Sequence, residues 1–275
     1  MKNMRPINQI LGDAFVYTCA LEQSFTYEQF VPEHLLAYQI SGETHIYHQK
    51  REMILRKGQL LLGRRNQFAK TIKLPGEDKA YQCISVVLSA ERLRQYAMSN
   101  GIVSEDRYIG KKNILLDPNA FMKGYFHSIV PYVEEWKSAS KKLAAIKVNE
   151  AIELILHLRP DLVSFLFDLA DPKKQDLEAF MLNNFHYNVP LEHFAKLSGR
   201  SLTTFKREFE DIFKESPGIW LKNKRLSEAF YLIREKKQKA PDLYLNLGFE
   251  NLSHFYTCFK KKYGMTPTEI STKIK

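Results

Sequence analysis

Two histidines and a glutamate are the residues of this sequence whose types and spacing come nearest to metal chemistry. His45 and His48 lie a few residues before Glu52, and imidazoles and carboxylates together can form a catalytic metal site. However, the two histidines are three residues apart in an extended run, so their side chains point to opposite faces of a strand. The sequence has no evident glycine-rich phosphate loop, nucleophile elbow or paired-carboxylate arrangement. We therefore expect no catalytic residues, no metal and no other cofactor.

The three cysteines do not form a metal or disulfide pattern. Cys19, Cys83 and Cys258 are far apart and odd in number, which argues against a disulfide framework or a cysteine-based zinc site and fits a reducing cytoplasm. The longest uninterrupted apolar runs are only a few residues long, whereas a bilayer span needs about 20 residues. We expect a cytoplasmic protein that has no membrane partner.

The charge of the chain points to an acidic partner but does not locate the surface that binds it. The 275 residues include 41 Lys and Arg against 31 Asp and Glu, a formal net charge of +10, which attracts polyanions. Residues 1–174 and residues 175–275 each carry an excess of five positive charges. Only the local arrangement of the basic residues can therefore identify the part that binds a polyanion.

The hydrophobic pattern changes from strands to helices before the middle of the chain. Short β-branched and aromatic runs about ten residues apart, over residues 12–90, predict a small β-barrel or sandwich. Helical periodicity follows over about 91–168, and the proline and lysines of 168–175 predict a boundary. We expect an α+β protein with one domain at 1–170 and an all-α domain at 171–275.

One of the predicted helices before this boundary carries a narrow apolar seam. Its residues recur at steps of four, three, four and three, which suits packing against a partner helix. Two partners fit the pattern: the same helix in a second copy of the chain, which would give a homodimer, or the β-domain of its own chain. The seam residues are Ala144, Val148, Ala151, Ile155 and Leu158.

Two stretches fifty residues apart share one buried pattern. Apolar residues at positions i, i+3, i+7 and i+11 define one face of an α-helix in each stretch. Ser201 and Asn251 stand one residue before these helices, where a short polar side chain caps the free amides. Gly199 and Gly248 precede the caps as turn residues. The matching apolar positions are Leu202, Phe205, Phe209 and Phe213 in the first stretch and Leu252, Phe255, Phe259 and Tyr263 in the second.

Each stretch, with the short helix before its glycine, follows the helix-turn-helix plan. We expect these units at about 191–213 and 241–263. Ser216–Pro217 predicts the start of a connecting helix, which runs to about Arg234. Roughly eighteen residues at 1.5 Å each make this helix about 27 Å long, and successive major-groove faces of DNA lie about 34–36 Å apart. A rod of this length can present one helix to each of two adjacent grooves.

The last 100 residues resemble the DNA-binding domain of the AraC/XylS family of bacterial transcription regulators. The stretch VPLEHFAKLSGRSLTTFKREFEDIF at 189–213 is similar to the family's first helix-turn-helix, and LGFENLSHFYTCFKKKYGMTP at 247–267 is similar to its second. One position departs from the family pattern: the small residue four positions before the signature glycine is kept as Ala195 but replaced by Tyr244. The resemblance implies a transcription regulator, by family habit an activator that works with RNA polymerase.

The side chains opposite the buried faces are the expected contacts to double-stranded DNA. Early positions of a reading helix usually meet base edges, and Arg207 is the strongest candidate because a guanidinium forks onto guanine. The alternative role of Arg207 is a surface salt bridge with Asp211. The alternative role of the lysines at 260–262 is to offset the helix dipole in the last helical turn. The expected DNA contacts are Thr203, Thr204, Lys206 and Arg207, then Ser253, His254, Tyr256, Thr257, Lys260 and Lys261, with Arg200, Lys222, Lys224 and Arg225 at phosphates.

The β-rich region resembles the cupin-like domain that accompanies this DNA-binding domain in many family members. In such proteins the barrel binds a small effector or a regulatory protein, and the helices after it dimerise. An apolar cavity in the barrel would favour a metabolite, and a filled interior would favour a protein partner. The competing interpretation is a cupin-type metal-dependent enzyme with an appended DNA-binding domain.

Overall fold

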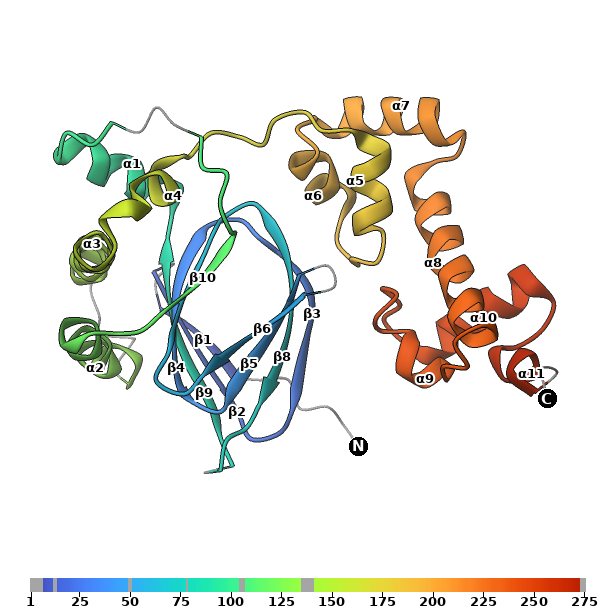
Figure 1. Ribbon diagram of the computed structural model, residues 1–275, viewed down its shortest axis with the longest axis horizontal. Coiled ribbons are helices and arrows are strands. Elements are labelled where there is room, and N and C mark those ends of the chain that lie inside the picture. Colours follow the sequence, from blue (N-terminus) through green and yellow to red (C-terminus); the bar gives the residue numbers. More distant parts are fainter. Residues whose placement is uncertain are drawn as a thin grey trace. The chain divides into compact units, whose positions relative to one another are not determined.

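The computed structural model of the chain describes residues 7–11, 14–48, 51–77, 79–103, 107–134 and 141–272 (Figure 1). The chain forms two compact units. The first is built from Met1–Thr26 and Val31–Ala170, and the second from Asp171–Lys275 together with Tyr27–Phe30. No helix in the described ranges combines the length and the apolar character that crossing a bilayer requires.

The first unit is built on two β-sheets. One has six antiparallel strands in the order β1-β2-β9-β4-β7-β10, and the other has four strands in the order β3-β8-β5-β6. The strands are β1 (Ile7–Leu11), β2 (Phe15–Ala20), β3 (Ser24–Val31), β4 (His34–Ser41), β5 (Glu43–His48), β6 (Arg51–Arg56), β7 (Leu60–Gly63), β8 (Gln67–Leu74), β9 (Tyr81–Leu88) and β10 (Asn113–Leu116).

The central strands of the six-stranded sheet are buried on both faces. Successive side chains of a strand point to opposite faces, and β7 shows the consequence. Leu60 and Leu62 belong to the core shared with the helices, whereas Leu61 packs with Ile46 and Leu55 of the four-stranded sheet. A short run of leucines is therefore stable here because both faces of the strand are covered by apolar neighbours.

Four helices and a single 3₁₀ turn complete the described part of the first unit. They are α1 (Ala90–Ser99), α2 (Ala120–Glu134), α3 (Lys141–Leu158), the 3₁₀ turn Pro160–Leu162 and α4 (Val163–Phe167). Figure 1 shows these helices on one side of the strands. They cover the face of the six-stranded sheet that carries Phe15, Leu36 and Val86, all of which are buried.

The apolar seam of α3 packs inside its own unit. Val148, Ala151 and Ile155 are 3%, 0% and 0% exposed and belong to the core beneath the helices. Ala144 and Leu158 are half-buried against the same core. Of the two partners that fit the seam, the chain's own unit therefore covers Val148, Ala151 and Ile155, and these three residues are not available to a second copy of the chain.

Over residues 171–272, the secondary structure of the second unit consists only of helices. They are α5 (Leu177–Asn184), α6 (Leu191–Leu197), α7 (Leu202–Phe213), α8 (Pro217–Arg234), α9 (Ala240–Leu243), α10 (Leu252–Tyr263) and α11 (Pro267–Thr272). Figure 1 shows α5, α6 and α7 at one end of α8, and α9, α10 and α11 at the other end. The predicted helix from Pro217 to Arg234 is confirmed.

Aromatic side chains of α7 and α10 pack against the two ends of α8. Near its start, the Trp220 ring lies 4.5 Å from that of Phe213, centroid to centroid. Near its end, the Phe230 ring lies 4.6 Å from that of Tyr263. Each contact joins α8 to the last turn of a helix-turn-helix unit, so the connecting helix is part of both cores.

Candidate nucleic-acid interface

Both helix-turn-helix turns are built around a glycine with positive φ. The φ angle is +74° at Gly199 and +77° at Gly248. A Cβ at Gly199 would lie 2.5 Å from the carbonyl carbon of Lys173, and a Cβ at Gly248 would lie 2.7 Å from the carbonyl oxygen of His186. Each turn therefore needs glycine both for its backbone conformation and for the close approach of another segment.

The two turns share one hydrogen-bond pattern despite the tyrosine in the second. The carbonyl of Ala195 accepts from the N–H of Arg200, and that of Tyr244 accepts from the N–H of Phe249, both at 2.9 Å. Ala195 is buried, whereas Tyr244 is half-buried against the core around α10. The helix before the second turn is the shorter, with four residues in α9 against seven in α6. The larger side chain is thus accommodated without a change in the hydrogen bonds of the turn.

The predicted caps and buried faces of the reading helices, α7 and α10, are confirmed. Ser201 Oγ accepts from the N–H of Thr204 at 3.3 Å, and Asn251 Oδ1 accepts from the N–H of His254 at 2.7 Å. These caps satisfy amides that have no partner within the helix. Four phenylalanines are fully buried beneath the two helices, namely Phe205, Phe209, Phe255 and Phe259.

The outer face of α7 presents Thr203, Lys206 and Arg207 to solvent. Thr204 is half-buried, and its hydroxyl accepts a hydrogen bond from the cap serine at 2.9 Å. Arg207 forms no ion pair with any described residue, so the alternative salt bridge with Asp211 is not observed. Its guanidinium is therefore available to a partner outside the chain.

The outer face of α10 is polar, but two of its hydroxyls already have partners. Tyr256 is half-buried, and its hydroxyl lies 3.2 Å from that of Thr268. The hydroxyl of Thr257 donates to the carbonyl of Ser253 one turn earlier, at 2.9 Å. The exposed candidates on this helix are Ser253, His254, Thr257, Lys260 and Lys261.

Three of the predicted contacts meet at a hollow beside the N-terminus of α10. Lys222 and Arg225 from α8 and His254 from α10 line this hollow, whose volume is about 290 Å³. Cationic side chains and a helix N-terminus together favour an anion such as a phosphate. Asn188 and Glu250 also line it, with their side chains 3.2 Å apart. No sequence pattern marks these two residues, because 62 positions separate them.

Arg225, expected at a DNA phosphate, joins two segments of the second unit. Its Nε, Nη2 and Nη1 atoms donate to the carbonyl oxygens of Phe185, Tyr187 and Gly248 at 2.8, 2.7 and 3.2 Å. The guanidinium therefore joins the segment after α5 to the second turn. Three of its five N–H groups are therefore taken by backbone carbonyls, which gives Arg225 a structural role that its predicted phosphate contact did not include.

Arg200 is likewise a structural residue. Its side chain is only 5% exposed and donates to Glu208 at 2.8 Å, to the carbonyl of Ser198 at 2.6 Å and to that of Gln175 at 3.0 Å. Glu208 also pairs with Lys174 at 2.7 Å, and these two cations hold the pKa of Glu208 below its usual value. The predicted phosphate contact at Arg200 is contradicted by this burial.

The lysines of α8 and α10 have different surroundings. Lys222 is exposed, whereas the Lys224 ammonium lies 5.6 Å from the centroid of the Phe185 ring. Lys262 donates to the carbonyl of Asn223 at 2.7 Å and so ties α10 to α8. Of the three consecutive lysines of α10, Lys262 thus makes a contact within the chain, whereas Lys260 and Lys261 have exposed side chains.

The histidine considered for metal binding has carboxylate neighbours of its own. His45 Nδ1 lies 2.7 Å from Glu52, and its Nε2 lies 3.1 Å from Glu43. The side chain of His48 falls outside the described part of the chain. Across the described residues, no group of three or more histidine, cysteine, aspartate or glutamate side chains is placed to hold a metal ion.

Two family models match this chain. Residues 194–273 match a helix-turn-helix domain, and residues 34–165 match the ExsA N-terminal regulatory domain. The virulence regulon transcriptional activator VirF of Yersinia enterocolitica is 31% identical over 113 residues, which is 41% of this chain and 42% of VirF. The HTH-type transcriptional regulator ExsA of Pseudomonas aeruginosa is 28% identical over 128 residues, 46% of each chain. The matches span less than half the length of these curated relatives.

Among solved structures, apo ToxT from Vibrio cholerae aligns with 95% of this chain and 98% of its own, at 11% identity and a TM-score of 0.47. Similarity at that level says nothing about what this chain binds. The glycine turns, the capped helices and the matched models define a helix-turn-helix protein with an N-terminal regulatory unit. The chain belongs to the AraC family of transcription regulators.

Proposed function

We propose that this protein is a sequence-specific, double-stranded DNA-binding transcription activator of the cytoplasm. Helices α7 and α10 would enter two adjacent major grooves of one duplex. The observation that carries the proposal is the repetition of one arrangement. Two helices of 12 residues, each capped at its start and each with an exposed polar face over buried phenylalanines, are joined by the 18 residues of α8. The names of VirF and ExsA as transcriptional regulators support it.

The DNA contacts divide between base edges and phosphates. Arg207 would read a guanine through its two guanidinium edges, with Thr203 and Lys206 beside it and with Ser253 and Thr257 on α10. Lys222, Lys260 and Lys261 are exposed and would contact phosphates. If six to ten phosphates are neutralised across a dimer, the logarithm of the affinity falls by about 5–9 per decade of salt.

A homodimer would use a face of α3 other than its buried seam. Leu143 and Ile146 stand about one turn apart on this helix and are 47% and 53% exposed. Large apolar side chains exposed together are typical of an association surface. We infer that these two residues contact a second copy of the chain.

Regulation would come through the first unit. Its two sheets would form a cupin-like domain that responds to a small effector or to a regulatory protein, and the activated dimer would contact RNA polymerase. The match of residues 34–165 to a regulatory domain supports a regulatory role for the first unit.

The affinity of an Arg207→Ala variant tests the proposed function. The full-length protein is first used to select its preferred duplex from a random library, and affinities are then measured for that duplex and for random DNA. We expect the variant to lose about 1–3 kcal/mol on the selected duplex and less on random DNA, because a base contact contributes only at the right sequence. Arg234→Ala, which removes an exposed arginine that pairs with Glu235, serves as the control. An equal loss on both DNAs, or failure of the wild-type protein to select any duplex, would contradict the proposal.

A further inference from the structure

A larger cavity lies in the first unit, at the point where the chain leaves it. The second half of α1, residues 101–103 and the end of α4 with the residues after it line this cavity, whose volume is about 760 Å³. Sites that hold small molecules usually have volumes of about 300–1,000 Å³. None of its lining residues is among those expected to contact DNA.

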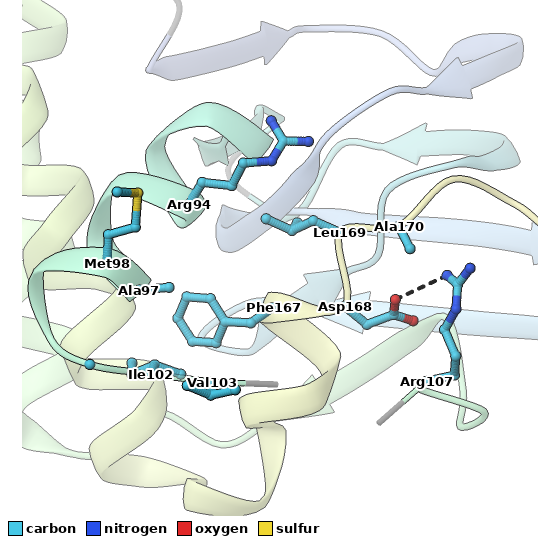
Figure 2. Close-up of a pocket in the computed structure, with 11 residues that line it drawn as sticks. Arg94, Ala97, Met98, Ile102, Val103, Arg107, Phe167, Asp168, Leu169 and Ala170 are labelled. Atoms are coloured by element: carbon cyan, nitrogen blue, oxygen red, sulfur yellow. Dashed lines mark hydrogen bonds and ion pairs between the residues drawn. The ribbon is translucent and has the colours of Figure 1, made fainter. Parts of the chain in front are cut away.

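The walls of this cavity are mainly apolar. Phe167 and Leu169 lie in the middle of the lining, as Figure 2 shows, and Ala97 stands beside the Phe167 ring. Met98 and Val103 are 84% and 77% exposed, although both are large and apolar. An exposed apolar surface in a hollow gains free energy when an apolar group covers it.

Two arginines flank the apolar wall. Arg94 comes from α1 and Arg107 from the segment before Tyr108, and Figure 2 shows Leu169 and Ala170 between the two arginines. Arg107 Nη1 lies 3.1 Å from an oxygen of Asp168. Arg94 is exposed and forms no ion pair with any residue that the structure describes.

Asp168 is the one carboxylate among the described residues that line the cavity. Asp168 is bound by Arg64 at 2.6 Å and by the N–H of Tyr108 at 3.1 Å, and its side chain is only 5% exposed. Burial raises the pKa of Asp168, but the bonds from Tyr108 and Arg64 outweigh it and keep that pKa below its usual value. The carboxylate is therefore charged and shared between Arg64 and Arg107. Among the described residues that line the cavity, two arginines stand against this one carboxylate.

We propose that this cavity binds a small organic anion with an apolar body, such as an aromatic carboxylate. The apolar body would cover Phe167 and Leu169, and the anionic group would lie between Arg94 and Arg107. An anion on Arg107 competes with Asp168, which directly follows α4 and is only two residues before the end of the first unit. Binding would thereby change how firmly residues 168–170 are held. Any consequence for DNA affinity rests on the proposed function, whereas the binding itself does not.

Fluorescence titration of the full-length chain with 8-anilinonaphthalene-1-sulfonate, an aromatic anion, tests the binding. Saturable one-to-one binding is expected for the wild type and for Arg92→Gln, which removes a charge from α1 outside the cavity. Arg94→Gln, which removes the anion partner, and Val103→Trp, which fills the cavity from an exposed position, should each weaken binding at least tenfold. Circular dichroism of both variants should match that of the wild type.

Displacement of this probe tests the charge requirement with three ligands that share one ring. Indole-3-acetate, tryptophol and tryptamine carry a negative, a neutral and a positive group on indole, and indole-3-acetate should displace the probe at concentrations at least tenfold lower than tryptamine. Equal probe binding by all four chains, equal displacement by the three indoles, or no saturable binding would each overturn the proposal. Because the readout contains no DNA, these results are independent of whether the chain binds a duplex.

Discussion

Replacement of Arg225 by lysine tests whether this arginine stabilises the fold or serves only as a phosphate contact. The Nε, Nη2 and Nη1 atoms of Arg225 donate to carbonyls of Phe185, Tyr187 and Gly248, which surround a planar fork of donors. Lysine keeps the charge, but its donors are on one nitrogen atom and cannot reach three separated carbonyls at once. We therefore expect Arg225→Lys to destabilise the second unit, whereas a simple phosphate contact would tolerate the change.

The magnitude follows from the hydrogen bonds that the lysine cannot form. A hydrogen bond to a charged group contributes about 1.5–3 kcal/mol, and we expect the ammonium to keep one of the three. Because Arg225 is half-buried rather than buried, partial solvation of the freed carbonyls reduces the cost. The expected loss is about 2–4 kcal/mol in the free energy of unfolding. For a domain of about 100 residues this corresponds to roughly 10–20 °C in Tm.

Trp220 offers a direct readout of this loss. The chain has two tryptophans, so a Trp136→Phe background leaves Trp220, whose ring lies 4.5 Å from that of Phe213, as the single emitter. Urea unfolding followed by its fluorescence measures the stability of the second unit. The matched control is Lys222→Gln on the same helix, which removes an exposed charge and should leave the unfolding midpoint unchanged. A wild-type midpoint for Arg225→Lys would refute the structural role.

Two further predictions concern the first unit. Changing both Leu143 and Ile146 to lysine should convert a dimer of two 32.2 kDa chains into monomers in sedimentation equilibrium without DNA, and a double variant that still dimerises would contradict the proposed surface. Burial, with the nearby charge of Arg64, lowers the pKa of His34 to about 3, so below pH about 6.5 the unfolded chain binds a proton that the folded unit does not. Keeping His34 neutral therefore costs the folded unit nothing above that pH. Below it, the free energy of unfolding decreases by up to about 1.4 kcal/mol per pH unit. Urea unfolding at pH 7 and pH 5 should show a smaller decrease for His34→Gln than for the wild type, and equal decreases would count against this origin.

The helix-turn-helix units were predictable because their signals are local. Residues three, four and seven positions apart share a face of any α-helix, so the spacing of Phe205 and Phe209 indicated burial without knowledge of the partner. The caps at Ser201 and Asn251 act within one turn of the chain. Gly199 could be placed in a turn for the same reason, although the clash that excludes a side chain there comes from a distant segment.

The roles of the arginines were not predictable, because they depend on groups far along the chain. Arg200, Arg207 and Arg225 all lie near a turn or on a helix that could face DNA. Only the fold shows that Arg225 reaches carbonyls 38 and 40 residues away, and that Arg200 reaches one 25 residues away. Arg207 has no such partner among the described residues, so it is the one of the three whose guanidinium makes no structural contact there.

The seam of α3 shows the same limit for apolar residues. Apolar residues at steps of four and three predict that one face of a helix is buried. They do not indicate whether a second chain or the chain's own sheet covers that face. In the helix-turn-helix units and the connecting helix, the sequence alone determined where the helices begin and which faces are buried, since these follow from interactions between near neighbours. The tertiary structure decided what covers each face and which charged groups are left for a partner, because those outcomes depend on contacts between residues that the chain brings together only when it folds.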